Sequence, residues 1–215
     1  MSKINLFINY FDHSNSLRRK EIEFCLEKNQ ENEYLHQIII VNRNERATYG
    51  DFFRAMNDYS EDVNIIANAD IYFDETIQLS ERIKENQCYA LTRWEDVNGT
   101  IMDFNQRHGR PSPPEWSQDA WIFRGSTEPI HYDNVDAVRD NRHREVIPFS
   151  LGIPGCDNKI AALLKEKGFK VTNPSLNIRA IHKHLNPSRD YPNYQILKGI
   201  KPNGLVFQTK LGINQ

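Results

Sequence analysis

The sequence predicts an α/β fold in which helices flank a mixed, mostly parallel central sheet. Short apolar and β-branched runs, typical of buried strands, recur at residues 4–10, 38–41 and 63–67. Segments with the apolar spacing of amphipathic helices separate these runs. Two strand–helix–strand units follow each other. Because a helical crossover joins parallel strands, this order indicates a parallel sheet covered on its faces.

The first half of the chain supplies these elements in alternation. Residues 14–16, Ser-Asn-Ser, provide an N-cap for a helix over 17–29. Thr48 and Asp51 have the spacing of a capping box, which opens a second helix that runs to about residue 59. The remaining predicted elements are strands at 36–42, 63–67 and 88–94 and a helix at 76–85.

The second half of the chain is less regular. We expect long irregular segments at 94–117 and 125–145, which lack a clear hydrophobic period. A helix is predicted over 157–167, because apolar residues recur there at helical spacing and Gly168 follows as a C-cap. Further strands are expected at 119–124, 169–172, 177–184 and 205–209.

Composition narrows the class of protein. Hydrophobic residues make up 39% and charged residues 26% of the chain, which fits a globular rather than a disordered protein. The net charge of −2 provides no field that would attract nucleic acid, and no apolar run approaches the ~20 residues of a membrane span. The three cysteines are scattered without metal-ligand spacing, which favours a reducing, cytoplasmic compartment.

The stretch 63–74, VNIIANADIYFD, follows a buried strand with polar residues. An extended chain would place Asn68, Asp70 and Asp74 on one side, because they are separated by even numbers of residues. A carboxylate at the end of a buried strand is costly unless it is compensated, and a divalent cation with oxygen ligands would compensate it. The alternative is that Asp70 and Asp74 cap the following turn or helix.

Two histidines stand close together in a predicted strand near the C-terminus. His182 and His184 are two residues apart, so both imidazoles would face the same way. Imidazole is a good ligand for transition metals such as Mn²⁺, and one histidine would complete a mixed oxygen and nitrogen site with a distant carboxylate. The alternative is two surface histidines at the end of a strand.

Two further acids are candidates for chemistry. Asp157 follows a Gly-Ile-Pro-Gly-Cys turn at a helix start, where it is either an N-cap or a general base. These interpretations conflict, because capping would lower the pKa of the carboxyl and weaken the base. Asp119 stands near Trp116 and Gln118, and such a group of aromatic and planar polar side chains suits a sugar ring. A lone acid at a strand start is otherwise structural.

Residues after the first strand are candidates for contact with a nucleotide, because ligands of open α/β sheets bind beyond the carboxyl ends of strands. Asn9 and Tyr10 occupy this position. Several basic residues would be able to neutralise a diphosphate, although most charge runs are solvated surface. They are Arg18, Arg19, Lys20, Arg142, His143 and Arg144.

Taken in order, these pieces resemble the GT-A glycosyltransferases, which are nucleotide-sugar-dependent enzymes with a Rossmann-like fold and an Asp-x-Asp metal motif. The matching segments are INLFINYF, NIIANADIYFD, WSQDAWIF, LGIPGCDNKIAALL and NPSLNIRAIHKH. The resemblance extends over nearly the whole chain. It is closest to small, compact transferases of bacterial polysaccharide loci and large DNA viruses. It implies a single domain over 1–215, with a nucleotide-binding half at 1–94 and an acceptor half at 95–215.

The resemblance also implies roles for individual residues. Asn68 stands where the first acid of Asp-x-Asp would be, and Asp70 stands where the last, metal-binding acid would be. One of His182 and His184 matches a histidine that some families add to the metal shell. Asp119 matches a position that contacts the donor sugar. Asp157 matches the base of inverting members; in a retaining enzyme it would bind acceptor or donor instead.

The implied activity is metal-dependent transfer of a hexosyl group from a nucleotide-diphosphate donor, with a UDP-sugar favoured, to a hydroxyl of a saccharide acceptor. Mn²⁺ or Mg²⁺ would bridge the diphosphate. Asn9, Tyr10, Arg18 and Asn68 would contact the donor.

Two other functions share parts of this pattern. A sugar-phosphate nucleotidyltransferase would have the same sheet and metal. It would usually carry a glycine-rich loop after the first strand, where this chain has Asn9-Tyr10-Phe11-Asp12. A non-catalytic module that binds nucleotide-sugars or glycans would not need Asp70 and the C-terminal histidines together.

Overall fold

The computed structural model confirms the α/β class. It describes residues 2–10, 13–41, 46–108, 115, 117–125, 138–139, 145–146, 149–185 and 202–212. Trp116, Arg142, His143 and Arg144, which the sequence marked as candidate ligand-binding residues, lie outside these ranges.

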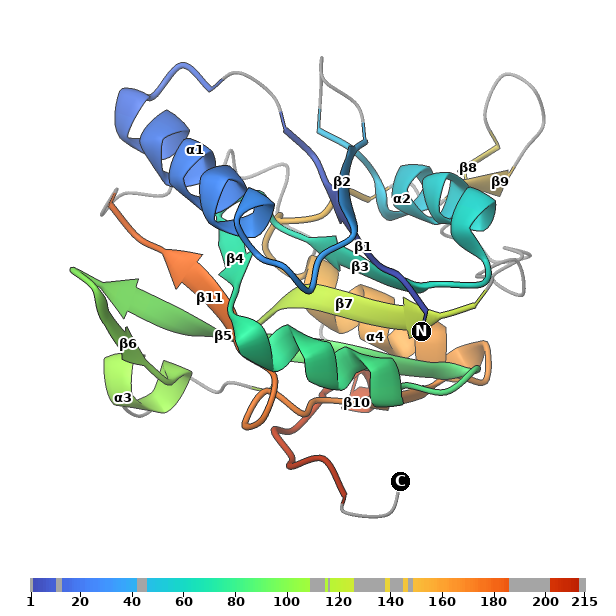
Figure 1. Cartoon of the computed structure of the whole chain (residues 1–215). Helices are drawn as coiled ribbons and strands as arrows, with labels where there is room; N and C mark the ends of the chain where they lie inside the picture. Colours follow the sequence, from blue (N-terminus) through green and yellow to red (C-terminus); the bar gives the residue numbers. More distant parts are fainter. Residues whose placement is uncertain are drawn as a thin grey trace.

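A nine-stranded sheet forms the centre of the molecule, with strand order β2-β1-β3-β7-β5-β11-β4 and with β6 and β10 also paired to β5 (Figure 1). The strands of this sheet are β1 (Ile4–Ile8), β2 (Gln37–Ile40), β3 (Val63–Ala67), β4 (Ile71–Phe73), β5 (Gln87–Val97), β6 (Thr100–Met102), β7 (Gln118–Arg124), β10 (Lys170–Thr172) and β11 (Ala180–Lys183). A second, two-stranded sheet pairs β8 (Val138–Arg139) with β9 (Glu145–Val146).

The sheet is mixed, and the expectation of a mostly parallel sheet is wrong. β1 is parallel to β2 and β3, and β5 is parallel to β10 and β11. However, β7 runs antiparallel between β3 and β5, β6 pairs antiparallel with β5, and β4 pairs antiparallel with β11. With β8–β9 included, antiparallel pairings predominate among the described strands. The long segment before β7 can return the chain in either direction, so the sequence pattern did not determine its orientation.

Helices cover both faces of the sheet (Figure 1). The α-helices are α1 (Ser16–Gln30), α2 (Tyr49–Met56), α3 (Phe104–His108) and α4 (Cys156–Glu166), and the 3₁₀ helices are η1 (Asn57–Tyr59), η2 (Glu75–Arg82) and η5 (Pro202–Gly204). Both expected N-caps are present. The Asn15 side chain accepts hydrogen bonds from the first turn of α1, and Thr48 and Asp51 form a reciprocal capping box on α2.

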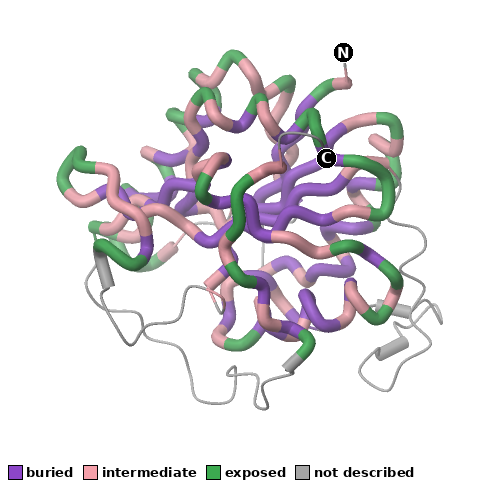
Figure 2. Tube along the Cα trace, turned by 90° about the horizontal axis from the view of Figure 1, so that it is seen from below, coloured by how far each residue is buried: buried purple, intermediate pink, exposed green. Residues whose placement is uncertain are grey.

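Two buried apolar clusters lie on the opposite faces of the sheet. One lies beneath α2 and α4 and includes Phe52, Trp121 and Ile160. The other includes Ile65 and Ile77 and packs against α1 and η2. Adjacent residues of β1, β3 and β7 alternate between the two clusters, as the pleat of a strand requires. Figure 2 shows that buried residues concentrate in the central strands.

Three predicted elements differ from those observed. The segment 76–85 forms the 3₁₀ helix η2 rather than an α-helix. The segment 94–117 is partly regular, because β5 continues to Val97, turns at Asn98 and Gly99 with positive φ angles, and pairs with β6. Within 205–209 there is no strand, and Gln208 makes only an isolated bridge to Asn173. In segments this short, the hydrophobic pattern does not distinguish an α-helix from a 3₁₀ helix, or a strand from an irregular segment.

Candidate functional site

Most of the candidate residues gather at one edge of the sheet, where β1, β3 and β5 end and β7 begins. β2 and β3 pair with opposite sides of β1, and their connecting helices pack with different apolar clusters, so the chain reverses its winding direction between β1 and β3. Such a reversal is a topological switch point, and ligands of open α/β sheets bind outside the carboxyl ends of the strands there. Asn9 and Tyr10 follow β1, and Asn68 follows β3.

Asn9 closes the connection that leaves β2. Its Nδ2 donates to the carbonyl of Val41 at 3.0 Å, and its Oδ1 accepts from the amide of Ala47 at 2.9 Å. Both ends of the segment between these residues are thereby tied to the end of β1. Tyr10 is half-buried and packs against the apolar cluster on the α1 face. Their contact with a nucleotide stays a prediction.

Asp70 lies at the centre of a buried group of charges. Its Oδ2 accepts a hydrogen bond from Arg18 Nη1 at 2.6 Å and lies 2.8 Å from His182 Nε2. The other ring nitrogen of His182 lies 2.9 Å from Glu95 Oε2. Helix α1 positions Arg18, and the parallel register of β11 with β5 places His182 opposite Glu95. We call Arg18, Asp70, His182 and Glu95 the Asp70 centre.

Opposite charges adjust the ionisation of the Asp70 centre. Burial opposes charge on His182, but the Asp70 and Glu95 carboxylates outweigh it and raise the pKa of the imidazole. Burial also acts against charge on Glu95, yet the hydrogen bonds and charges of His182 and Arg93 hold its pKa well below the usual range. These neighbours therefore favour an ionised Glu95 and a protonated His182.

A second group of side chains surrounds Asp119 at the start of β7. Arg93 Nη1 donates to Asp119 Oδ2 at 2.9 Å, and Asn68 Nδ2 donates to Asp119 Oδ1 at 2.6 Å. The same guanidinium donates through Nε to Glu95 Oε1 at 2.6 Å. Arg93 and Glu95 thus connect the Asp70 centre to Asp119 in one continuous polar network.

Asp157 belongs to the same region, but it does not cap the helix. The N-cap of α4 is Gly155, with φ 89°, and Asp157 lies in the first turn beyond it, so the capping interpretation is wrong. The Cys156 thiol donates to Asp157 Oδ1 at 3.1 Å, and Tyr49 donates its hydroxyl proton to Cys156 Sγ at 3.9 Å. Burial, reinforced by the Asp119 carboxylate, raises the pKa of Asp157 well above its ordinary value.

The turn before α4 packs directly against Asn68. A Cβ at Gly152 would lie 2.8 Å from Asn68 Oδ1 and 3.2 Å from Arg46 Nη1, and the φ of Gly152 is +74°. Only a glycine meets both conditions without rearrangement. Arg46 Nη1 also donates to the carbonyl of Leu151 at 3.2 Å. The segment that carries Asp157 is therefore fixed at the switch point.

Asn68, Asp70 and Asp74 do not share one side of the chain. The chain turns after β3, where the amide of Ile71 donates to the carbonyl of Asn68, so the extended geometry assumed from the spacing is absent. Asp74 accepts from the amide of Thr76 and caps η2, which confirms the capping alternative for this residue. The ring of His184 lies 5.4 Å from that of His182, measured between centroids, and its role as a ligand stays a prediction.

The Asp70 centre fits a divalent cation in the chemistry of its donors. It offers a buried carboxylate beside Nε2 of His182, which would suit Mn²⁺ once the imidazole has released a proton. Among the described residues, no group of three or more His, Cys, Asp or Glu side chains has the arrangement of a metal site. An ion at Asp70 Oδ2 would have to replace the contacts of Arg18 and His182 with this oxygen.

Sequence reasoning missed Arg93, Glu95 and Cys156 as members of this site. Arg93 and Glu95 stand two residues apart, so they lie on the same face of an extended strand. The predicted strand ended at residue 94, and for this reason the pair was not recognised. Cys156 carried no signal, because a lone cysteine before a helix is usually a small apolar residue.

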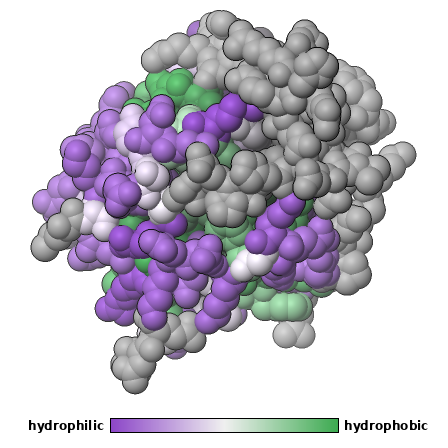
Figure 3. Space-filling model, turned by 90° about the vertical axis from the view of Figure 1, so that its right-hand side faces the viewer, coloured by the Kyte–Doolittle hydropathy of each residue, from purple (hydrophilic) through white to green (hydrophobic). Residues whose placement is uncertain are grey.

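No helix among the described residues is long and apolar enough to span a bilayer. The described residues on the face shown in Figure 3 are mainly hydrophilic.

Comparison of the chain with protein-family models, curated proteins and solved structures found no match.

Proposed function

We propose that the protein is a glycosyltransferase that moves a sugar from a nucleotide-diphosphate donor to a hydroxyl of a saccharide acceptor. The observation that carries this proposal is the position of the polar network. Asn68 and Asp119 lie at the switch point between β1 and β3, and the network continues from them to Asp70. A nucleotide placed by the general rule for open α/β sheets would meet these side chains.

The proposed fold is GT-A. The run β1–α1–β2–α2–β3 forms three neighbouring parallel strands with helices on opposite faces, and this arrangement supports a Rossmann-like nucleotide-binding half. The antiparallel β7 then brings Asp119 to the same edge as Asn68. The resemblance in the segments around Asn68, Asp119 and Asp157 favours a UDP-sugar as donor.

Asp157 is the base of the proposed reaction. The acceptor oxygen attacks the anomeric carbon, the bond from that carbon to the diphosphate oxygen breaks, and the hydroxyl proton passes to the Asp157 carboxylate. A raised pKa makes this carboxylate a stronger base than an exposed aspartate. Asp119, held by Arg93 and Asn68, is fixed in orientation and accepts hydrogen bonds from donor-sugar hydroxyls.

Asp70 and a histidine of β11 hold the divalent cation in this proposal. Mn²⁺ or Mg²⁺ bound there supplies positive charge that offsets the charge developing on the leaving nucleotide. The residues of the chain contribute orientation. Glu95 fixes the ring of His182 through Nδ1, which leaves Nε2 directed at Asp70.

A thermal-shift panel tests the proposal. UDP-, GDP-, CMP- and dTDP-sugars are each added with and without Mn²⁺, and release of the nucleoside diphosphate is assayed in parallel. A true donor binds only the folded state, so it raises the melting temperature, and it does so most strongly when Mn²⁺ is present. The UDP-sugars are expected to give the largest shift.

Two matched variants locate the effect. Asp70→Asn should remove the Mn²⁺-dependent part of the shift, whereas Asp74→Asn alters a nearby carboxylate that caps η2 and should retain it. A panel with no shift and no nucleotide release contradicts the proposal. A shift without any release, in the presence of varied saccharide acceptors, would identify a binding module instead.

A further inference from the structure

We propose that Arg18 and the divalent cation compete for the Asp70 carboxylate, so that binding of the cation releases the Arg18 guanidinium to an anionic ligand such as a diphosphate. The inference rests on the proposed function. It concerns which contact of Asp70, that of Arg18 or that of His182, is displaced when a cation binds, and the geometry distinguishes the two.

One oxygen of Asp70 carries the contacts that matter. Arg18 Nη1 and His182 Nε2 lie 2.6 Å and 2.8 Å from the same atom, Oδ2. A cation coordinated to this oxygen at about 2.0–2.2 Å would occupy the space that the guanidinium now fills. It would also repel the Arg18 guanidinium, which cannot lose its charge, whereas the His182 imidazole can release a proton when the cation binds. The cation and the Arg18 contact are therefore mutually exclusive.

Arg18 is the exchangeable partner. Its side chain is 25% exposed and begins in the first turn of α1, whereas the side chain of His182 is 1% exposed and is held by Glu95 from the neighbouring strand. Arg18 also has a second carboxylate on its own helix, because Nη1 donates to Glu21 Oε2 at 2.7 Å. The guanidinium can leave Asp70 and keep this partner, whereas the buried imidazole stays held by Glu95 and exchanges only its Nε2 proton for the cation.

Release has a consequence for the donor. While Arg18 pairs with both Asp70 and Glu21, its charge is compensated. Once the cation takes over Asp70, the guanidinium regains donors with a planar fork that matches a phosphate group. The cation then binds Asp70 and the diphosphate binds Arg18. Because either ligand breaks the Arg18–Asp70 pair, each favours binding of the other.

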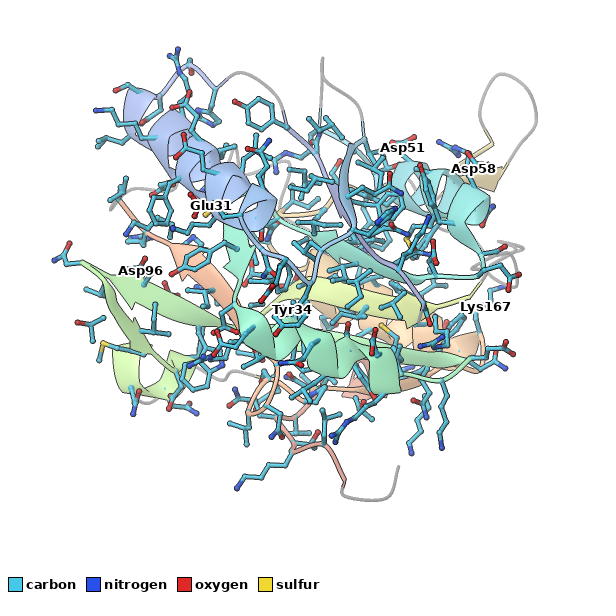
Figure 4. The ribbon with its side chains drawn as sticks, viewed as in Figure 1. Glu31, Tyr34, Asp51, Asp58, Asp96 and Lys167 are labelled. Carbon is cyan, nitrogen blue, oxygen red and sulfur yellow. The ribbon has the colours of Figure 1, made fainter. Side chains whose placement is uncertain are left out.

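The test measures Mn²⁺ binding alone, by titration calorimetry without any nucleotide. Three proteins are compared: the wild type, Arg18→Gln, and Lys28→Gln. Lys28 is a matched control because it lies on the same helix and pairs with Glu31 across one turn, at the surface (Figure 4 labels Glu31). Loss of the competing charge should tighten Mn²⁺ binding by about tenfold or more in Arg18→Gln, whereas Lys28→Gln should stay within about twofold of the wild type.

Each alternative result is informative. If all three proteins bind Mn²⁺ equally, the competition is refuted while the metal site of the proposed function stands. If none binds Mn²⁺, the competition and the metal site both fail. If binding tightens as expected but no sugar transfer is found with any donor, the competition holds and the transferase proposal fails.

A second variant guards against misfolding of Arg18→Gln. Arg18→Lys keeps a positive charge but lacks the fork, so its contact with Asp70 is weaker. It should bind Mn²⁺ with an affinity between those of the wild type and Arg18→Gln. Binding by Arg18→Lys that is weaker than in the wild type would overturn the proposal even if Arg18→Gln does not fold.

Discussion

The Asp70 and Asp157 carboxylates lie at the same edge of one sheet, yet their surroundings are opposite in charge. Asp70 is contacted by a guanidinium and an imidazole. Asp157 is contacted by a neutral thiol and lies near a second carboxylate, Asp119, which together with burial raises its pKa. The first surroundings compensate a negative charge, and the second favour a group that takes up a proton more readily than an exposed aspartate.

This difference would suit the two identical side chains to the separate tasks proposed for them. A carboxylate that is held ionised serves to bind positive charge, whereas one with a raised pKa serves as an acid or a base. Arg93 lies between the two environments, because it pairs with Glu95 of the Asp70 centre and with Asp119. Substitutions that exchange the surroundings of the two acids should therefore exchange or abolish their roles.

The largest effect is expected for Asp70→Asn, with Asp96→Asn as its control. Asp96 is an equally buried carboxylate on β5, paired with Lys183 at 2.9 Å, and it lies outside the Asp70 centre (Figure 4). Breaking either buried pair should cost about 3–5 kcal/mol of the free energy of unfolding, measured in urea. Sugar transfer should be lost only in Asp70→Asn. Equal activity of the two variants would remove Asp70 from the site.

Asp157→Asn should reduce kcat by about 10²- to 10⁴-fold, because the acceptor hydroxyl loses its base, with little change in KM for the donor. The free energy of unfolding of Asp157→Asn, in contrast to its kcat, should not fall below that of the wild type above about pH 4. The raised pKa means that the folded state keeps its proton when the unfolded state has lost it, so the wild type loses stability as pH rises from about 4 toward the raised pKa. Urea unfolding of Asp157→Asn should lack this decline; a parallel decline in both proteins would contradict it.

His182→Gln tests the Asp70 centre through pH, with a chelator present. The neighbouring carboxylates raise the pKa of His182 in the folded state, so its contribution to stability is complete below its ordinary pKa of about 6.5 and is lost as pH rises through the raised value. The difference in free energy of unfolding between wild type and variant should therefore shrink on the alkaline side. A difference that stays constant from pH 5 to 9, within about 0.5 kcal/mol, would show that folding does not raise the pKa of His182.

Local signals in the sequence predicted helices, strands and caps, but not the polar network that joins Asp70 to Asp119. Asn15, Thr48 and Asp74 act on amides only a few residues away, so their capping roles follow from spacing alone. The strand after Val63 and the helix before Gly168 were likewise predicted from apolar spacing, and the structure confirms both.

Contacts between distant strands were beyond the reach of such signals. Arg93 meets Asp119 because β7 runs antiparallel to β5, and this direction depends on how the preceding segment returns the chain. His182 meets Glu95 because β11 joins β5 in parallel register. The sequence brought Asp70 and His182 into one hypothesis only as donor types that suit one metal site, and Arg18 entered as a general basic residue rather than as the partner of Asp70.

The smallest effect is expected for the thiol beside the base. Burial raises the pKa of Cys156, so the thiol is protonated and donates to Asp157, and this hydrogen bond favours the ionised carboxylate. Cys156→Ala should therefore move the acidic limb of the kcat profile to higher pH by less than about one unit, whereas Cys156→Ser, which keeps a donor, should not. Cys88→Ala, which removes another buried thiol, serves as the control for lost packing. A shift of the limb in Cys88→Ala as large as in Cys156→Ala would assign the effect to packing, and the thiol hydrogen bond would then make no contribution to the pKa of Asp157.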